Sequence, residues 1–168
     1  VTGPLGSLVE ASYGIIQEKQ MAVMEMAEAS GIILVKREEL DPARATTYGT
    51  GEMILDAARR GCREFLMGIG GSATTDGGVG MLSTLGYEFL DEAGVPILPG
   101  AGSLGDIAQI RDEKVPQCIK ESRFRIACDV QNPLLGENGA VFVYGPQKGV
   151  KPEDRILFDQ KMAHYAKK

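Results

Sequence analysis

The sequence contains no tryptophan, one histidine and three cysteines among its 168 residues, which argues against several kinds of catalytic centre. Cys62, Cys118 and Cys128 are odd in number and show no C-x-x-C spacing, so neither a disulfide framework nor a thiolate zinc site is expected. We predict three inert thiols. His164 lies on a predicted final helix without a serine or cysteine partner, so we expect it at the surface and expect no Ser-His-Asp centre.

An excess of positive charge is also missing, because 18 Lys and Arg stand against 23 Asp and Glu for a formal net charge of −5. This balance offers no general attraction to nucleic acid or to an anionic membrane surface. No apolar run approaches the ~18 residues of a membrane span. The first residues, 1–4, show neither an initiator Met nor a signal-peptide pattern. We therefore expect a cytoplasmic protein, and a piece of a longer chain.

Glycine is abundant, with 22 in 168 residues. Periodic apolar segments alternate with the glycine-rich ones, so these are loops with special backbone requirements and not flexible linkers. Region 21–30 fits either a helix or a short strand running into one. The predicted strands cover 8–16, 32–35, 65–69, 87–90, 124–130 and 140–144, and the predicted helices cover 51–60, 79–85 and a last helix from 152. This alternation predicts an α/β domain.

The densest glycine segment, residues 68–78, reads GIGGSATTDGG and joins a predicted buried strand to a predicted helix. Glycines there let the backbone adopt positive φ and approach a ligand, and free N–H groups at a helix start attract anions. Ser72, Thr74 and Thr75 add hydroxyl groups, and Asp76 adds a carboxylate suited to Mg²⁺ or to a substrate hydroxyl. The segment predicts a ligand with anionic and hydroxyl or metal character. A tight turn with small-residue packing is the plainer alternative.

A competing interpretation of this segment is a dinucleotide site. Gly68, Gly70 and Ala73 match the pattern G-x-G-x-x-A, and Asp91 ends a predicted strand about 20 residues later, where a ribose-binding acid would stand. Against it, Gly68 lies inside the apolar run, and Asp76 would place a carboxylate near the pyrophosphate. The phosphate-loop ATPase motif is absent, since no Lys-Ser or Lys-Thr pair follows the glycines.

Three further segments are candidates for the same site. Asp129 ends a predicted strand and Asn132 follows in a turn, where open α/β sheets place ligands, although an Asx turn would also explain them. Lys148, in the turn GPQKG, offers a cation for a phosphate or carboxylate, or is simply solvated. Thr47, in TTYGTG before a predicted helix, belongs to a second hydroxyl-rich segment or to a helix cap.

Several long motifs, in register, resemble the bacterial glycerate kinases of the first type. They are TTYGTGE at 46–52, GIGGSATTDGGVG at 68–80, ACDVQNPL at 127–134 and FVYGPQKG at 142–149. The resemblance extends along residues 1–168. It implies a mixed sheet with flanking helices, like the central domain of that family's two-domain α/β fold. It also implies transfer of the γ-phosphoryl group of Mg-ATP to a hydroxyl of D-glycerate, giving 2- or 3-phosphoglycerate.

The same resemblance implies roles for individual residues. Asp76 and Asp129 would be catalytic, each able to bind Mg²⁺ or to accept the hydroxyl proton, and we expect Asp→Asn at either to lower kcat with little loss of fold. The residues implied to bind substrate or phosphate are Thr47, Gly70, Gly71, Ser72, Thr74, Gly77, Gly78, Asn132 and Lys148.

Members of this family are longer than 168 residues, with an Asp-Ser-Phe-Lys-Gly segment, an acidic Asp-Gly-Gly-Glu-Gly segment and another glycine-rich loop that residues 1–168 lack. The resemblance therefore implies that residues 1–168 form a single α/β domain, a fragment of a two-domain kinase that needs the remainder of its chain for turnover. A dinucleotide-binding Rossmann-like domain and a non-catalytic binding module remain as alternatives.

Overall fold

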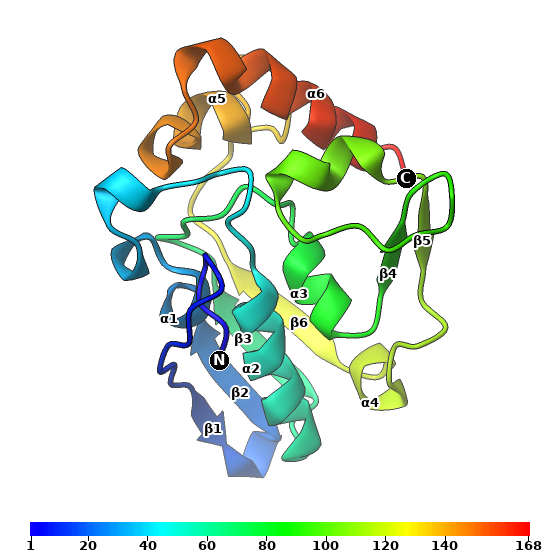
Figure 1. Ribbon diagram of the computed structural model, residues 1–168. Coiled ribbons are helices and arrows are strands. Elements are labelled where there is room, and N and C mark those ends of the chain that lie inside the picture. Colours follow the sequence, from blue (N-terminus) through cyan, green and yellow to red (C-terminus); the bar gives the residue numbers. More distant parts are fainter.

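The computed structural model describes residues 1–168 as two β-sheets surrounded by helices (Figure 1). The strands are β1 (Gly14–Ile16), β2 (Met21–Glu25), β3 (Glu64–Gly68), β4 (Glu88–Leu90), β5 (Gln109–Arg111) and β6 (Arg123–Ala127). The helices are α1 (Ala27–Ser30), α2 (Tyr48–Arg59), α3 (Val79–Thr84), α4 (Gln117–Lys120), α5 (Ala140–Tyr144) and α6 (Arg155–Tyr165). No helix has the length and apolar character needed to cross a membrane.

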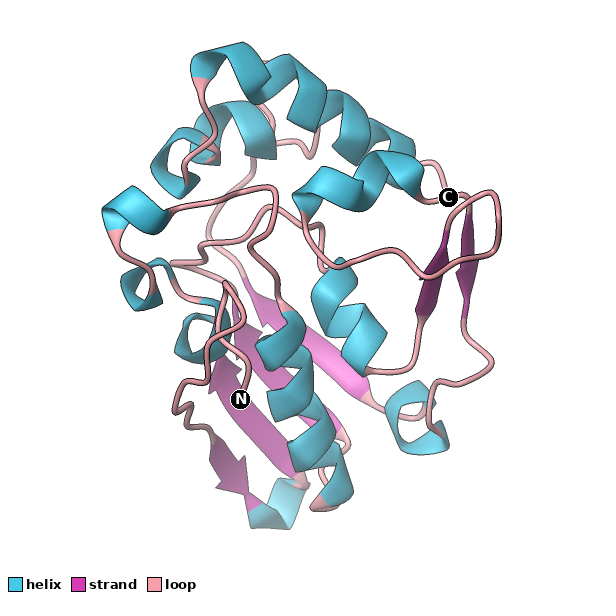
Figure 2. Ribbon diagram, in the orientation of Figure 1, coloured by secondary structure: helices cyan, strands magenta, loops and turns pink.

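The main sheet has the strand order β1-β2-β3-β6 and is mixed, because β1 is antiparallel to β2 while β2, β3 and β6 are parallel. Figure 2 shows this sheet apart from the small antiparallel pair β4 and β5. In the register of the parallel strands, Gly68 lies between Glu25 and Ala127. The carboxyl ends of β2, β3 and β6 therefore meet at one edge. The prediction of a mixed α/β sheet with flanking helices is confirmed.

Helix α2 crosses one face of the main sheet (Figure 1). Its buried residues Met53, Ile54 and Ala57 recur at helical spacing and pack with Phe65 and Met67 of β3 in the first hydrophobic cluster. Gly61, with φ of +95°, follows the end of the helix, as the sequence predicted.

A second hydrophobic cluster lies around β4, α6 and the 3-10 helix at 101–106. Phe89, Leu104 and Met162 are buried in it, with Tyr165 packed against it. Helix α3 contributes Val79 to this cluster, whereas Leu85, just beyond its last turn, belongs to the first cluster. The start of α3 and the glycine segment before it therefore stand where the two clusters meet.

Three of the predicted strands were wrong in whole or in part. Residues 140–144 form helix α5, because no strand of either sheet is adjacent and only Val141 is fully buried. Residues 32–34 form a 3-10 helix in which Ile33 is 87% exposed, so that run is not a buried strand. Only the last three residues of 8–16 form β1, since Leu8 is exposed. Region 21–30 is a strand running into a short helix.

Candidate functional site

The glycine segment forms the connection from β3 to α3, which we call the glycine loop (residues 69–78). Gly71, Gly77 and Gly78 have φ of +68°, +59° and +81°, a conformation that side chains with a Cβ rarely adopt. Gly70 faces open space, with no atom within 4 Å of where its Cβ would be. The segment that follows α1 anchors the loop, because Ile32 N donates to Gly71 O at 2.8 Å and Ala73 N donates to Ser30 O at 2.9 Å.

The loop leaves most of its backbone donors unused. Among residues 70–77, only Ala73 donates its N–H group to an acceptor in the protein. Gly70 and Gly71 are exposed and Ser72 is half-buried, so their three consecutive N–H groups are at an accessible surface. A run of unpaired backbone N–H groups is an arrangement that binds anions.

Asp76 is buried and holds the loop to the start of two helices. Its Oδ2 accepts hydrogen bonds from Thr47 N and Thr47 Oγ1, each at 2.8 Å, and from Gly80 N at 3.1 Å. Its Oδ1 accepts a bond from Gly78 N at 3.2 Å. Thr47 Oγ1 in turn accepts from Met81 N at 2.9 Å. The carboxylate thus satisfies N–H groups at the beginnings of α2 and α3, which sequence reasoning did not foresee.

Lys148 reaches the loop from the turn after α5. Its Nζ donates to Ser72 Oγ and to Thr74 O, both at 2.7 Å. Burial lowers the pKa of Lys148 to about 8, and the nearby charge of Asp76 opposes that shift in part. A lysine with two protein acceptors has one N–H left for a ligand. Lys148 therefore places a positive charge against the same stretch that exposes its N–H groups.

Asp129 and Asn132 are less closely connected to the loop. Asp129 is exposed beyond the carboxyl end of β6, and its carboxylate accepts no hydrogen bond from the protein. Asn132 Nδ2 donates to Asn138 O at 3.0 Å, and Asn132 Oδ1 accepts from Tyr144 OH at 2.6 Å. Two sets of hydrogen bonds therefore hold the glycine loop: one joins Thr47 and Gly78 to Asp76, and the other joins Ser72 and Thr74 to Lys148. Asn132 belongs to neither set, because it bonds to Asn138 and to Tyr144 of α5.

The donor set of the site suits a phosphate or carboxylate better than a bare metal ion. No three His, Cys, Asp or Glu side chains come close enough together to hold a metal. Thr75 Oγ1 is buried without a hydrogen-bond partner, so the loop also contains an unused hydroxyl group. Because Mg²⁺ is commonly held by one or two carboxylates together with substrate phosphates, the exposed carboxylate of Asp129 fits that manner of binding.

The competing dinucleotide interpretation fails, because β4 pairs only with β5, outside the parallel sheet, and because Asp91 Oδ1 accepts from Ala93 N and Val95 N in a turn. His164 is half-buried, and its Nε2 donates to the carbonyl of Ile107 at 2.7 Å.

Sequence reasoning also missed close contacts that explain two glycines. A Cβ on Gly77 would lie 2.7 Å from Cε1 of Tyr165, and a Cβ on Gly80 would lie 2.0 Å from Thr46 Oγ1. Burial raises the pKa of the Tyr165 phenol, as the charge of Asp76 also does. These contacts cross long sequence separations, so no local spacing pattern could have indicated them.

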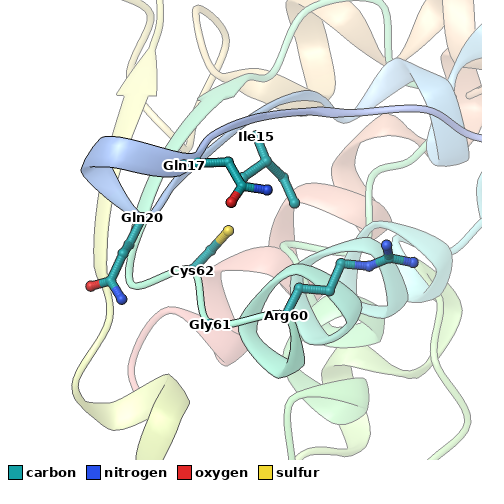
Figure 3. Close-up of a pocket in the computed structure, with 6 residues that line it drawn as sticks. All are labelled: Ile15, Gln17, Gln20, Arg60, Gly61 and Cys62. Atoms are coloured by element: carbon teal, nitrogen blue, oxygen red, sulfur yellow. The ribbon is translucent and has the colours of Figure 1, made fainter.

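The opposite end of the sheet contains a cavity of about 470 Å³ (Figure 3). It lies near the amino ends of β2 and β3. Its lining residues are Ile15, Gln17, Gln20, Arg60, Gly61 and Cys62. Arg60 Nε already donates to Asp56 Oδ2 at 2.8 Å, and Asp56 also accepts from the hydroxyl of Tyr13. Burial raises the pKa of the Cys62 thiol, so this cavity presents no activated nucleophile.

Comparisons with known proteins agree on one family. The sequence profile described as the glycerate kinase family matches residues 1–168. The chain is 46% identical over 166 residues to a glycerate kinase from Halalkalibacterium halodurans, covering 99% of this chain and 44% of that protein. Identity, length and both coverages are the same for glycerate 2-kinase from Escherichia coli. This chain thus spans less than half the length of these relatives.

A solved structure gives the same result in three dimensions. The crystal structure named for glycerate kinase 2 of Salmonella typhimurium LT2 superposes with a TM-score of 0.95 at 42% sequence identity. The superposition covers 99% of this chain and 45% of that one. The arrangement of strands and helices described above is therefore also present as one part of a longer polypeptide.

Proposed function

The chain belongs to the glycerate kinase family, and we propose that, within a full-length member, it forms one wall of the site where ATP phosphorylates a hydroxyl of D-glycerate. The observation that carries the proposal is the run of unpaired N–H groups at Gly70, Gly71 and Ser72, with the Lys148 ammonium group bonded to Ser72 Oγ. Both substrates are anions at neutral pH, glycerate through its carboxylate and ATP through its phosphates. A site rich in hydrogen-bond donors with one half-buried cation suits either substrate.

In this proposal, the loop residues bind and Asp76 positions them. The N–H groups of residues 70–72 and the third N–H of Lys148 hold a carboxylate or phosphate oxygen. Phosphoryl transfer depends mainly on placing the two reactants and on balancing charge. Asp76, whose oxygens accept four hydrogen bonds, keeps the donors of the loop aimed at the ligand.

Asp129 supplies a carboxylate that is exposed and accepts no hydrogen bond from the protein, so it is available to react or to bind a metal ion. Its exposure at the end of β6 lets it either accept the proton of the attacking hydroxyl or bind the metal ion. Mg²⁺, when bound, would neutralise charge on the phosphates. We assign the chemical role to Asp129 and the positioning role to Asp76, a division that the sequence alone left open.

The test is a chimera in which residues 1–168 replace the matched part of the Salmonella protein, assayed for glycerate-dependent consumption of ATP. Lys148→Met should lower kcat/KM for glycerate by about 100-fold, because it removes a charged donor from a partly buried anion site. Lys151→Met is the matched control, since Lys151 is exposed three residues away, and it should change kcat/KM by less than about twofold. An inactive parent chimera, or equal effects of the two substitutions, would contradict the proposal.

A further inference from the structure

The main sheet is covered on one face only. Ala22, Met24, Phe65 and Met67 face α2 and are buried in the first cluster. The alternate residues face the other way, and the register places Val23 beside Leu66 and Leu66 beside Arg125. We call this side the outer face, made by Ile16, Met21, Val23, Glu64, Leu66 and Arg125.

The outer face is apolar at its centre but open to solvent. Ile16, Val23 and Leu66 are 41%, 38% and 37% exposed, although Val23 and Leu66 lie on the two inner strands of the sheet. The carboxylate of Glu64 lies 3.8 Å from Arg123 and 3.6 Å from Arg125, so charges border this apolar centre. Parallel strands are normally covered on both faces of their sheet, and here the outer side of the parallel strands β2, β3 and β6 is open.

The edge of the sheet beside this face is open as well. Strand β6 is the last strand in the order, and all five of its residues are exposed. Arg123 N donates to Arg63 O at 2.8 Å, so the N–H groups of Phe124 and Ile126 point away from β3 by the alternation along a strand. Phe124 stacks on Phe65 at 4.7 Å and is still 38% exposed. An edge with free N–H groups and apolar side chains is a template for another strand.

One kind of partner would cover both the outer face and the free edge of β6. A strand added in parallel to β6 needs a crossover connection, and such a connection places a helix on a face of the same sheet. In the superposition this chain covers 45% of a longer polypeptide, and it likewise spans 44% of the Halalkalibacterium relative. We propose that the outer face and the β6 edge are the surface on which the rest of a full-length glycerate kinase packs, with a strand beside β6 and a helix across Leu66.

The experiment compares Leu66→Asp in the 168-residue chain and in the chimera described above, with thermal unfolding measured in the absence of substrate. The melting temperature should fall by about 1 °C or less in the 168-residue chain, where Leu66 already meets water, and by about 5 °C or more in the chimera. Leu66→Thr retains strand propensity and should show the same contrast if the Asp variant does not fold. Ile33→Asp, at a side chain 87% exposed outside the sheet, should have no effect in either protein.

Equal changes in the two proteins would overturn the proposal. So would a dimer of the 168-residue chain, seen by sedimentation, that Leu66→Asp dissociates, because a second copy would then be the occupant. Hydrogen exchange tests the edge without substitution: the amides of Phe124 and Ile126 should exchange fast in the short chain and slowly in the chimera. Fast exchange in both would overturn the added strand. None of these measurements depends on glycerate turnover, so they stand apart from the test of function.

Discussion

The two ends of the four-stranded sheet differ in how their polar groups are used. At the carboxyl ends, the glycine loop leaves N–H groups unpaired and accessible, while buried Asp76 and half-buried Lys148 hold it in place. At the amino ends, a cavity of about 470 Å³ is lined by two glutamines and by Arg60, whose guanidinium is already paired with Asp56. On this comparison rests our proposal that the binding end is marked by unused donors next to a half-buried cation, and not by the volume of a hollow.

The largest effect should follow from removing the carboxylate that holds the glycine loop in place. Asp76→Ala leaves the N–H groups of Thr47, Gly78 and Gly80 without their acceptor, so we expect a loss of about 3 kcal/mol in the free energy of unfolding, measured in urea. The sequence-based expectation that Asp76→Asn has little effect on the fold stays a prediction, since an asparagine keeps one acceptor oxygen at this position.

Asp106→Ala is the control for that measurement, because Asp106 is exposed and accepts no hydrogen bond. It should change the free energy of unfolding by less than about 0.5 kcal/mol. If the two variants unfold at the same urea concentration, Asp76 does not hold the loop.

A smaller effect should follow from raising the pH, because the pKa of Lys148 is lowered to about 8. The ammonium is charged below that pH and neutral above it, so kcat/KM of the chimera for glycerate should fall as the pH rises through about 8. Lys148→Arg should move this fall to higher pH, since a guanidinium stays charged. An unchanged inflection in the Arg variant would show that another group titrates.

The same shift in pKa affects stability in the opposite direction. The folded chain binds fewer protons at Lys148 than the unfolded chain does between pH about 8 and the ordinary lysine pKa of 10.5. The contribution of Lys148 to the free energy of unfolding should therefore rise with pH across that window. Lys148→Met should remove this rise from urea unfolding curves measured at pH 8 and pH 10.

The smallest effect should come from the other end of the sheet. Arg60→Met removes the guanidinium from the cavity, together with an exposed ion pair that contributes little. We expect kcat/KM of the chimera to stay within about twofold of the parent. A loss of tenfold or more would reverse the comparison and bring the cavity into the binding site.

The sequence predicted secondary structure correctly where the residues of one segment determine that segment's own helix or strand pattern. Helix 51–60 and strand 65–69 were predicted within three residues, because their own apolar spacing and a following Gly61 define them. Residues 140–144 could not be assigned in this way, since a run of five apolar residues fits a helix or a strand until its neighbours are known.

The candidate site shows the same difference between features encoded in one segment and features that depend on packing. The composition of the glycine loop predicted an anion site, which stays a prediction, and it predicted correctly that the segment joins a strand to a helix. It could not predict that Thr47 would donate to Asp76 across 29 positions or that Lys148 would reach Ser72 across 76. Such pairings depend on how the elements pack, which no single segment encodes.

The distance along the chain between Lys148 and Ser72 also bears on the order of events during synthesis. A ribosome makes the glycine loop first and adds the lysine 76 residues later. Domains fold as they emerge, so a nascent chain can hold β2, β3 and α2 in place while the loop still lacks its cation. The contact of Lys148 with Ser72 is then among the last to form, and a chain released before residue 148 would lack both that charge and helix α6, whose Tyr165 packs beside Gly77 of the loop.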